Sequence, residues 1–302
     1  MLTRVLIATL AALLCAQPAV AQDKQQEKLK VIATFSILAD LVKNVGGDRV
    51  EVTMLVGPNG DAHVYSPTPA DARKIADSKV VVSNGLGFEG WINRLVRASG
   101  SKAPVAVVTK GVKPRRMAGG HGHGHDHGSD PHAWQSVGNV KLYVANIRDA
   151  LAAADPAGKA AYEANAAAYS GKLDALEQEV REAVARIPAD RRKIITTHDA
   201  FGYFAEAYGV QFIAPHGVST EAQAAAKDVA RIILQIRRQK IPAVFLENVT
   251  DPRLIKQIAD ETGAKIGGTL YSDALTDDKG PAPTYIDLIR HNIRTLGAAL
   301  MS

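Results

Sequence analysis

The sequence predicts an α/β protein of two lobes, each with a mainly parallel sheet flanked by helices, joined by one long rigid helix. Two observations support this fold class. Short β-rich runs alternate with helical patterns in two separate blocks, which is typical of parallel sheets covered by helices. A single long amphipathic pattern lies between the two blocks. The predicted division is a signal peptide at 1–21, a first lobe at 22–154, a linking helix at 155–188 and a second lobe at 189–302.

The first block contains four candidate strands and the helices that connect them. Strands are expected at residues 29–34, 50–56, 80–83 and 105–108. Helices are expected at residues 36–45, 69–77, around 88–98 and at 139–154. Helical connections of this kind join strands that run in the same direction, so the first sheet should be parallel.

The linking helix is predicted from the spacing of its apolar residues. Asp155 and Pro156 supply an N-cap and a proline at the first helical position, and Pro188 ends the helix. Residues three, four or seven apart mark one buried face: Tyr162, Tyr169, Leu173, Leu176, Val180, Val184 and Ile187. A helix of this length between two lobes is expected to act as a rigid strut.

The second block repeats the alternation of the first. Strands are expected at 193–197, 210–213, 243–246 and 265–267, and helices at 201–208, 221–239, 252–262 and 286–299. Thr220 and Gln223 are spaced as a capping box for the helix at 221–239. Two lobes of the same class result.

The first residues predict export. Arg4 precedes an apolar run that ends at Cys15, and Ala19-Val20-Ala21 follows, so a secretory signal peptide cleaved after Ala21 is expected. The run is shorter than the about 20 apolar residues that span a bilayer. The bulky Leu14 before Cys15, the only cysteine, argues against a lipid-modified cysteine. The mature chain is therefore expected in the periplasm. Because Cys15 would be lost with the signal peptide, any metal site could use only nitrogen and oxygen ligands.

The charge pattern argues against a nucleic-acid partner. The chain has 36 basic and 31 acidic side chains, spread along its length. A nucleic-acid-binding protein concentrates its basic residues on one face or helix. Solvated surfaces explain the short basic runs better.

A histidine-rich segment at 111–129 interrupts the first lobe. Its composition cannot bury a core, so a mobile loop is expected. Four of the nine histidines alternate there with glycine and aspartate: His121, His123, His125 and His127. Two interpretations remain open, an auxiliary metal-binding role for these imidazoles and a solubilising linker.

Four other residues are candidates for a metal site. His63 lies between a strand and a helix, which is where open α/β sheets hold ligands. His132 stands between Pro131 and Trp134 in a stiff turn, His198 follows a strand, and Asp273 follows the last strand. Each alone also fits a loop histidine or a turn-capping carboxylate. Together, three imidazoles and one carboxylate, two from each lobe, make a four-ligand set that zinc accepts.

The sequence resembles a known family, the periplasmic solute-binding proteins of zinc and manganese ABC importers. The resemblance covers nearly the whole mature chain. It rests on ordered motifs at compatible spacings: Asp61-Ala62-His63-Val64-Tyr65-Ser66-Pro67, Asp130-Pro131-His132-Ala133-Trp134, Thr197-His198-Asp199-Ala200-Phe201, Gly217-Val218-Ser219-Thr220-Glu221 and Tyr271-Ser272-Asp273-Ala274-Leu275.

The resemblance implies a function and a site. It implies His63 and His132 as ligands from the first lobe, His198 and Asp273 as ligands from the second, and only limited movement of the lobes. The partner is expected to be an ABC importer permease, with a periplasmic zinc chaperone as a further candidate partner and a monomeric chain. The third ligand is histidine in zinc-type members and often glutamate in manganese-type members. His198 therefore favours Zn²⁺, with Mn²⁺ as the alternative, and nitrogen ligands favour zinc on chemical grounds as well.

Other functions are less well supported by the sequence. A secreted zinc hydrolase needs an open coordination position and a nearby base, and the chain has no His-Glu-x-x-His motif. We therefore expect no enzyme activity. His216 and His291 are expected to be structural or exposed, with His216 the better candidate for a further ligand. Glu247, after a strand, is expected to orient an imidazole or a turn.

Overall fold

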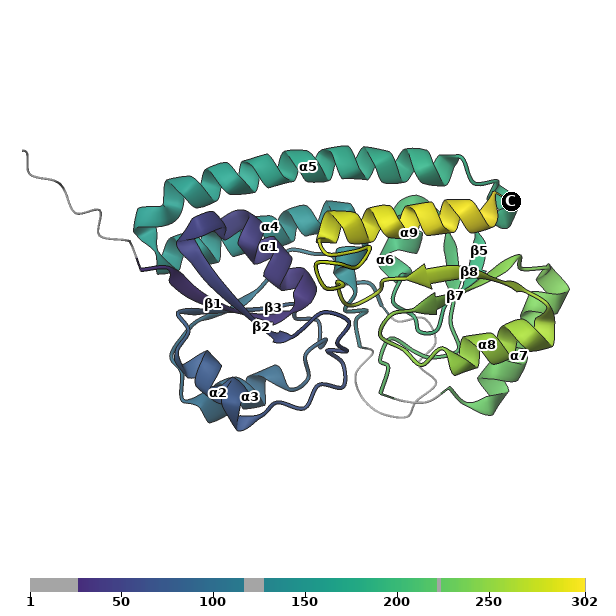
Figure 1. Ribbon diagram of the computed structural model, residues 1–302, viewed down its shortest axis with the longest axis horizontal. Helices are drawn as coiled ribbons and strands as arrows, with labels where there is room; N and C mark the ends of the chain where they lie inside the picture. Colours follow the sequence, from purple (N-terminus) through teal and green to yellow (C-terminus); the bar gives the residue numbers. More distant parts are fainter. Residues whose placement is uncertain (1–26, 117–127, 222–223, 302) are drawn as a thin grey trace, which may run out of the picture.

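A computed structural model describes residues 27–116, 128–221 and 224–301 of the chain. Two four-stranded parallel sheets lie side by side, each flanked by helices, and one helix of 27 residues runs across both (Figure 1). The predicted fold class is confirmed. Among the described residues, no helix has both the length and the apolar character needed to cross a membrane. The predicted signal peptide lies outside the described residues.

The first sheet contains the strands β1 (Leu29–Phe35), β2 (Val50–Val56), β3 (Val80–Ser83) and β4 (Val105–Val107). Their order is β2-β1-β3-β4, and every pair is parallel. The helices of this half are α1 (Ser36–Gly46), α2 (Pro69–Ala76), α3 (Ile92–Ser99) and α4 (Val137–Ala154). Three valines and Ser83 form β3, and all four residues are buried, as expected for a strand covered on both faces.

The second sheet has the same topology. Its strands are β5 (Lys193–Ile195), β6 (Gln211–Ile213), β7 (Ala243–Glu247) and β8 (Lys265–Leu270), in the order β6-β5-β7-β8. The helices of this half are α6 (Gly202–Tyr208), α7 (Ala226–Gln239), α8 (Arg253–Thr262) and α9 (Tyr285–Leu300). The strand order reverses between β5 and β7, and open sheets hold ligands beyond the carboxyl ends of the strands at such a point.

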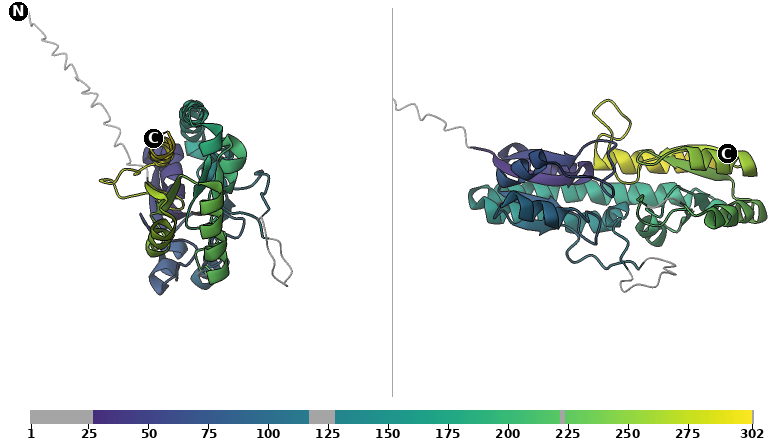
Figure 2. Two further views of the ribbon diagram at one scale, coloured as in Figure 1. Left: turned by 90° about the vertical axis from the view of Figure 1, so that its right-hand side faces the viewer. Right: turned by 90° about the horizontal axis from the view of Figure 1, so that it is seen from below.

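The long helix α5 (Lys159–Ala185) packs on α1, α4 and α9. The apolar face predicted from its spacing is buried, with Leu173, Leu176 and Val180 fully inaccessible. Figures 1 and 2 show α5 running the length of the molecule with α9 beneath its second half, so that the two helices form a layer above the sheets. One continuous apolar core joins residues of both lobes through this layer, and a second core fills the space between the second sheet and α7 and α8. The two lobes are therefore bound together by packing as well as by the chain.

Two helix starts differ from the predictions. Asp155 does not cap α5: Pro156–Gly158 forms a 3-10 turn, and the Asp155 carboxylate accepts hydrogen bonds from Arg49 at 2.9 Å and Tyr162 at 2.7 Å. The helix predicted at 221–239 begins only at Ala226. Thr220 makes no capping box there, because its hydroxyl donates to Asp61 in the first lobe at 2.6 Å. A tertiary contact replaces the local one in both cases. Gln223 lies outside the described residues.

Strand β8 is also longer than predicted. It continues through Gly267 and Gly268 to Leu270, although glycine disfavours a strand. A Cβ at Gly267 would lie 2.6 Å from the Phe245 ring and 2.8 Å from the Ala299 Cβ. Glycine therefore allows β8 to pass close to β7 and α9, and the strand reaches the segment that carries Asp273.

Candidate metal centre

Four predicted site residues meet where the lobes face each other. His63 follows β2, His132 directly precedes a short 3-10 helix at Ala133–Gln135, His198 follows β5, and Asp273 follows β8. Each offers a ligand atom, and these atoms all lie within 4.8 Å of one another. The side chains of His132, His198 and Asp273 are fully buried, and that of His63 is 5% exposed. The structure thus brings together residues from four distant segments of the chain.

The Asp273 carboxylate lies among the three imidazoles. Its Oδ2 is 3.1 Å from His198 Nε2 and 3.3 Å from His63 Nε2, and its Oδ1 is 3.6 Å from His132 Nε2. The Nε2 atoms of His63 and His132 are 3.2 Å apart. Asp273 Oδ1 has no hydrogen-bond partner among the described residues, although it is buried. A buried acceptor of this kind needs a partner, and a cation would supply one.

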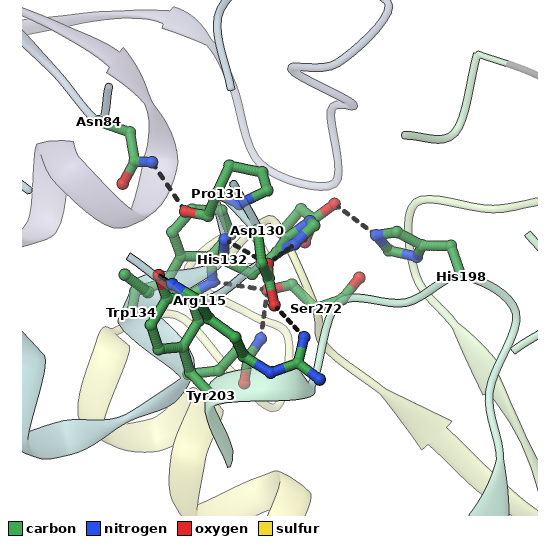
Figure 3. A network of polar contacts seen from close by, with 12 residues as sticks. Asn84, Arg115, Asp130, Pro131, His132, Trp134, His198, Tyr203 and Ser272 are labelled. Atoms are coloured by element: carbon green, nitrogen blue, oxygen red, sulfur yellow. Dashed lines mark hydrogen bonds and ion pairs between the residues drawn. The ribbon is translucent and has the colours of Figure 1, made fainter. Parts of the chain in front are cut away.

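Asp130 orients His132. One carboxylate oxygen accepts the His132 backbone N–H at 3.0 Å and lies 2.8 Å from the ring Nδ1. The other oxygen forms an ion pair with Arg115 at 3.1 Å, as Figure 3 shows. A carboxylate that holds Nδ1 turns Nε2 toward a metal and makes the imidazole a stronger donor. Asn84 fixes the same turn by donating to the Pro131 carbonyl at 2.9 Å.

Glu247 has the corresponding place behind His198. Its Oε1 accepts the backbone N–H of Thr197 at 2.6 Å and of His198 at 3.0 Å. Its Oε2 lies 2.6 Å from His198 Nδ1, which makes an ion pair when the imidazole is protonated. Glu247 ends β7 and His198 follows β5, so this pair lies at the reversal point of the second sheet.

His63 is held by its own turn and by an aromatic ring. The Asp61 carboxylate accepts the His63 backbone N–H at 2.9 Å. The Phe88 ring meets the imidazole edge-on, with centroids 4.6 Å apart. Trp91 donates to the carbonyl of Ala62 at 2.8 Å and ties this turn to α3. The His63 ring therefore has a defined position although its loop has no regular structure.

The electrostatics of the site favour a cation. Burial opposes the charged form of His198, but the carboxylates of Glu247 and Asp273 outweigh it and raise the pKa of His198 well above its usual range. Burial also opposes the charge on Asp273, yet His198 and His132 lower the pKa of Asp273 well below its usual range. Without a metal, a proton on His198 compensates part of the buried negative charge.

A divalent ion fits the charge of this cluster. Three buried carboxylates, those of Asp130, Glu247 and Asp273, surround the imidazoles, and Arg115 compensates one of them. With neutral histidines, the cluster carries two net negative charges, and a dication would balance both. Buried charges are tolerated when they are paired in this way.

The remaining predicted residues have other surroundings. His291, on α9, has its Nε2 3.0 Å from the Thr269 carbonyl and packs against Tyr271, so it ties α9 to β8 as a structural residue. His216 is half-buried and lines a cavity next to His198. The four histidines of the 111–129 segment lie outside the described residues. At the described ends of this segment, Arg116 and Ser129 pair in an isolated antiparallel bridge.

Three residues that contact the site were not identified from the sequence. Asp130 and Asp61 each stand two residues before a site histidine and accept its backbone N–H. This aspartate-x-histidine spacing, present twice, is a sequence signal that identifies both. No sequence pattern identifies Arg115, because its partner Asp130 is 15 positions away and the contact appears only in the folded protein.

Comparison with known proteins identifies the family. The family model "Zinc-uptake complex component A periplasmic" matches residues 31–299. The chain belongs to this family. The resemblance stated from the motifs is confirmed, and the chain is a periplasmic metal-binding component of an ABC importer, not an enzyme. Members of the zinc-uptake component family work with an importer permease and ATPase.

The relatives of this chain differ in the metal that their names give. The chain is 38% identical to the iron-binding protein YfeA of Yersinia pestis over 270 residues, 89% of this chain and 86% of that protein. It is 30% identical to the manganese ABC transporter lipoprotein PsaA of Streptococcus pneumoniae, over 97% of this chain and 96% of that one. The periplasmic zinc-binding protein TroA of Treponema pallidum superposes with a TM-score of 0.83 at 30% identity, over 90% of this chain and 99% of that one. Family membership thus shows that the cargo is a divalent metal ion. Which metal it is must be inferred from the ligands of the site.

Proposed function

We propose that this protein captures Zn²⁺ between its lobes, with His63, His132, His198 and Asp273 as ligands, and delivers it to the importer permease. The observation that carries the proposal is the convergence of three imidazole nitrogens and one carboxylate within 4.8 Å. Three nitrogens and one oxygen form a closed tetrahedral set of the kind that zinc accepts. With all four positions filled by the protein, the ion is held as cargo and no position is left for catalysis.

The choice of zinc depends on His198. Imidazole suits zinc, and nitrogen ligands favour zinc over manganese in the general order of affinities, whereas carboxylates and water suit manganese. Manganese is the second candidate, because manganese is named for PsaA and for a Mn-bound mutant of the periplasmic metal-binding protein of Candidatus Liberibacter asiaticus. The latter superposes with a TM-score of 0.82 at 33% identity, over 90% of this chain.

The decisive experiment is a competitive titration with Zn²⁺ and Mn²⁺, with the stoichiometry measured. The wild-type chain, His198→Ala, His198→Glu and a chain lacking residues 119–128 are compared. We expect one tight zinc that survives the deletion and is greatly weakened in His198→Ala. In His198→Glu the ratio of zinc to manganese affinity should fall by at least tenfold. Tight binding that disappears with the loop while His198 is irrelevant would overturn the proposal.

The same titration tests the histidine-rich segment. We propose that His121, His123, His125 and His127 bind additional zinc weakly and do not form the main site. The deleted chain should lose only weak sites that saturate after the tight one. Unchanged weak binding would favour the solubilising linker.

The location and partners of the mature chain are proposals as well. We propose a monomer released into the periplasm after cleavage behind Ala21, with a periplasmic zinc chaperone as a further candidate partner. Several relatives are named lipoproteins, among them the manganese-binding lipoprotein MntA of Halalkalibacterium halodurans, 32% identical over 98% of this chain and 96% of that one. Mass spectrometry of the mature N-terminus decides between cleavage after Ala21 and lipid on Cys15, and ultracentrifugation measures the oligomeric state.

A further inference from the structure

The segment that carries Asp273 is attached to the first lobe, although it follows the last strand of the second. The Ser272 carbonyl accepts hydrogen bonds from Trp134 Nε1 at 2.9 Å and Gln135 Nε2 at 2.7 Å. The Leu275 N–H donates to Ser36 Oγ at 2.9 Å, and the Leu275 carbonyl accepts the Asn59 N–H at 2.8 Å. Residues 272–276 are all buried. Four hydrogen bonds therefore fix Asp273 from both sides to the lobe that carries His63 and His132.

The start of α9 strengthens this attachment. The Tyr285 N–H donates to Asp40 on α1 at 2.9 Å, and the Tyr285 hydroxyl donates to the Trp134 carbonyl at 2.7 Å. Tyr285 is fully buried. The chain from Ser272 to the first turn of α9 is thus held against the first lobe at both of its ends.

The segment that carries His198 is attached differently. The N–H groups of Thr197 and His198 donate to Glu247, and the Asp199 N–H donates to the Gly217 carbonyl at 3.1 Å. The His216 N–H in turn donates to the Thr197 carbonyl at 3.2 Å. These hydrogen bonds all lie within the second lobe. The His198 segment is therefore bonded within the second lobe, whereas the Asp273 segment makes four hydrogen bonds to the first lobe and one to the second, from Asn248 Nδ2 to the Ala274 carbonyl at 3.2 Å.

The space beside His198 is open, in contrast to the packed side at Asp273. A cavity of about 480 Å³ lies there, with Asp61, Thr197, His198, His216 and Thr220 in its wall. A hydrogen bond crosses from one lobe to the other at this cavity, from the Thr220 hydroxyl to Asp61 Oδ2 at 2.6 Å. Asp61 uses its other oxygen to hold the His63 backbone. Thr220 is thereby linked to a site histidine through a single residue.

We propose that His63, His132 and Asp273 form a three-ligand half-site on the first lobe, and that the second lobe brings the fourth ligand, His198. The hydrogen bond between Thr220 and Asp61 then holds the two lobes closed around the metal. This inference rests on the proposed metal site and changes its division from two ligands per lobe to three and one. The layer of α5 and α9 acts as the hinge, since it lies on the side of the molecule opposite to α3 and α7 (Figure 1). Metal binds first to the half-site, and His198 then completes it and excludes water.

Thr220 is a positioning residue in this scheme, because it touches Asp61 and no ligand atom. Thr220→Val removes the hydroxyl and keeps the shape of the side chain. A hydrogen bond to a carboxylate contributes enough that its loss changes an equilibrium by about 10- to 100-fold. We expect zinc to dissociate about 10- to 100-fold faster, with little change in its association rate, and Thr220→Ser to restore the slow rate. A Thr220→Val variant with an unchanged dissociation rate would show that this contact does not hold the site closed.

Distance measurements between nitroxide labels test the division of the ligands. Cys15 is the only cysteine of the chain, so in a Cys15→Ala background labels attach only where cysteines are added. Arg94 on α3, Leu234 on α7 and Lys279 after β8 are exposed, so labels fit there. Double electron–electron resonance with and without Zn²⁺ then compares the pair at 94 and 234 with the pair at 94 and 279.

We expect zinc to shorten and narrow the 94–234 distance distribution while the 94–279 distribution stays the same. A 94–279 distance that shortens with the other would place Asp273 on the moving lobe and overturn the proposal. The proposal would also be overturned if zinc changed neither distance, because the lobes would then not close when the metal binds. Zinc stoichiometry is measured on the same labelled samples. If the labelled protein binds no zinc tightly, the proposed function itself is wrong. If it binds one zinc tightly but the distances do not change as expected, only the three-and-one division of the ligands is wrong.

Discussion

Glu247 contacts His198 at two points, through its Oε1 on the backbone N–H at 3.0 Å and through its Oε2 near Nδ1 at 2.6 Å. The same carboxylate holds the ring, sets its direction and supplies charge behind the proposed metal. Asp130 also contacts both the backbone N–H and Nδ1 of His132, but through a single oxygen, Oδ1. Two of the three imidazoles in the site are therefore fixed by a carboxylate before any metal arrives.

The first prediction concerns this carboxylate. Glu247→Gln keeps an acceptor for the backbone N–H groups and removes the charge. We expect zinc affinity to fall about 10- to 100-fold, as is usual when the carboxylate behind a ligating histidine is lost. Isothermal titration calorimetry with a competing chelator measures it. Glu163→Gln, an exposed change on α5, is the control and should bind as the wild type does. Equal affinity in the two variants would contradict a role for Glu247.

The second prediction concerns pH. The pKa of His198 is raised in the metal-free protein by Glu247 and Asp273 against the effect of burial, so zinc must displace a proton from it. Below that raised pKa, each unit of falling pH should weaken zinc binding by about tenfold per proton displaced. Titrations between about pH 5 and 8 in two buffers of different ionisation enthalpy count the released protons. An affinity independent of pH over this range would be incompatible with a three-histidine site.

The same shift predicts how stability depends on pH. A raised pKa in the folded state stabilises the metal-free fold below the pKa of a free histidine, about 6.5, and this contribution is lost as the pH rises through the folded value. Above it, three buried carboxylates remain with less compensation. The rise in Tm on adding zinc should therefore be larger at pH 8.5 than at pH 6. Differential scanning fluorimetry measures this rise in Tm. A larger rise at pH 6 than at pH 8.5 would contradict a raised pKa of His198 in the metal-free protein.

Gly202 packs directly against the Arg115–Asp130 ion pair. A Cβ at Gly202 would lie 2.1 Å from an Arg115 nitrogen and 2.6 Å from Asp130 Oδ2. Gly202→Ala should displace the guanidinium, lower the free energy of unfolding by about 1–3 kcal/mol and weaken zinc binding. Adding Arg115→Ala should restore part of the stability by making space, and a double-mutant cycle measures this coupling. Independent effects of the two changes would mean that Gly202 does not act through Arg115.

The fifth prediction concerns the core shared by both lobes. Leu173 is fully buried at the middle of α5, and Leu173→Ala should cost about 2–5 kcal/mol. Because one core continues across both lobes, we expect calorimetry to show one unfolding transition at a lower temperature. Lys172→Ala, exposed on the same helix, is the control. Two separated transitions in Leu173→Ala would show that the lobes unfold independently.

Local patterns in the sequence predicted much of this fold. The apolar spacing of α5 identified its buried face, and β-branched runs located the eight strands in the described part of the chain to within a few residues. The three histidines and Asp273 were proposed as ligands because each follows a strand or stands in a stiff turn, and the structure places their ligand atoms within 4.8 Å of one another. These features depend on neighbouring residues, which the sequence shows directly.

Contacts between distant residues explain the features that were missed. Thr220 has the spacing of a helix cap, yet it bonds to Asp61, 159 positions away. Asp273 follows a strand of the second lobe, yet its neighbours bond to Trp134, Gln135, Ser36 and Asn59 of the first. The spacing along the chain contains no information on such partners. The proposed division of the four side chains between the lobes therefore required the structure.

X-ray absorption at the zinc edge of the loaded wild-type protein tests the proposed ligand set most directly. A site built from these residues should show four ligands at about 2.0–2.1 Å, with the multiple scattering of three imidazoles and one oxygen donor. In His198→Ala the imidazole count should fall to two, with an oxygen from water in its place. Five or six oxygen ligands in the wild type, or a spectrum that His198→Ala leaves unchanged, would contradict a zinc site built from these four residues.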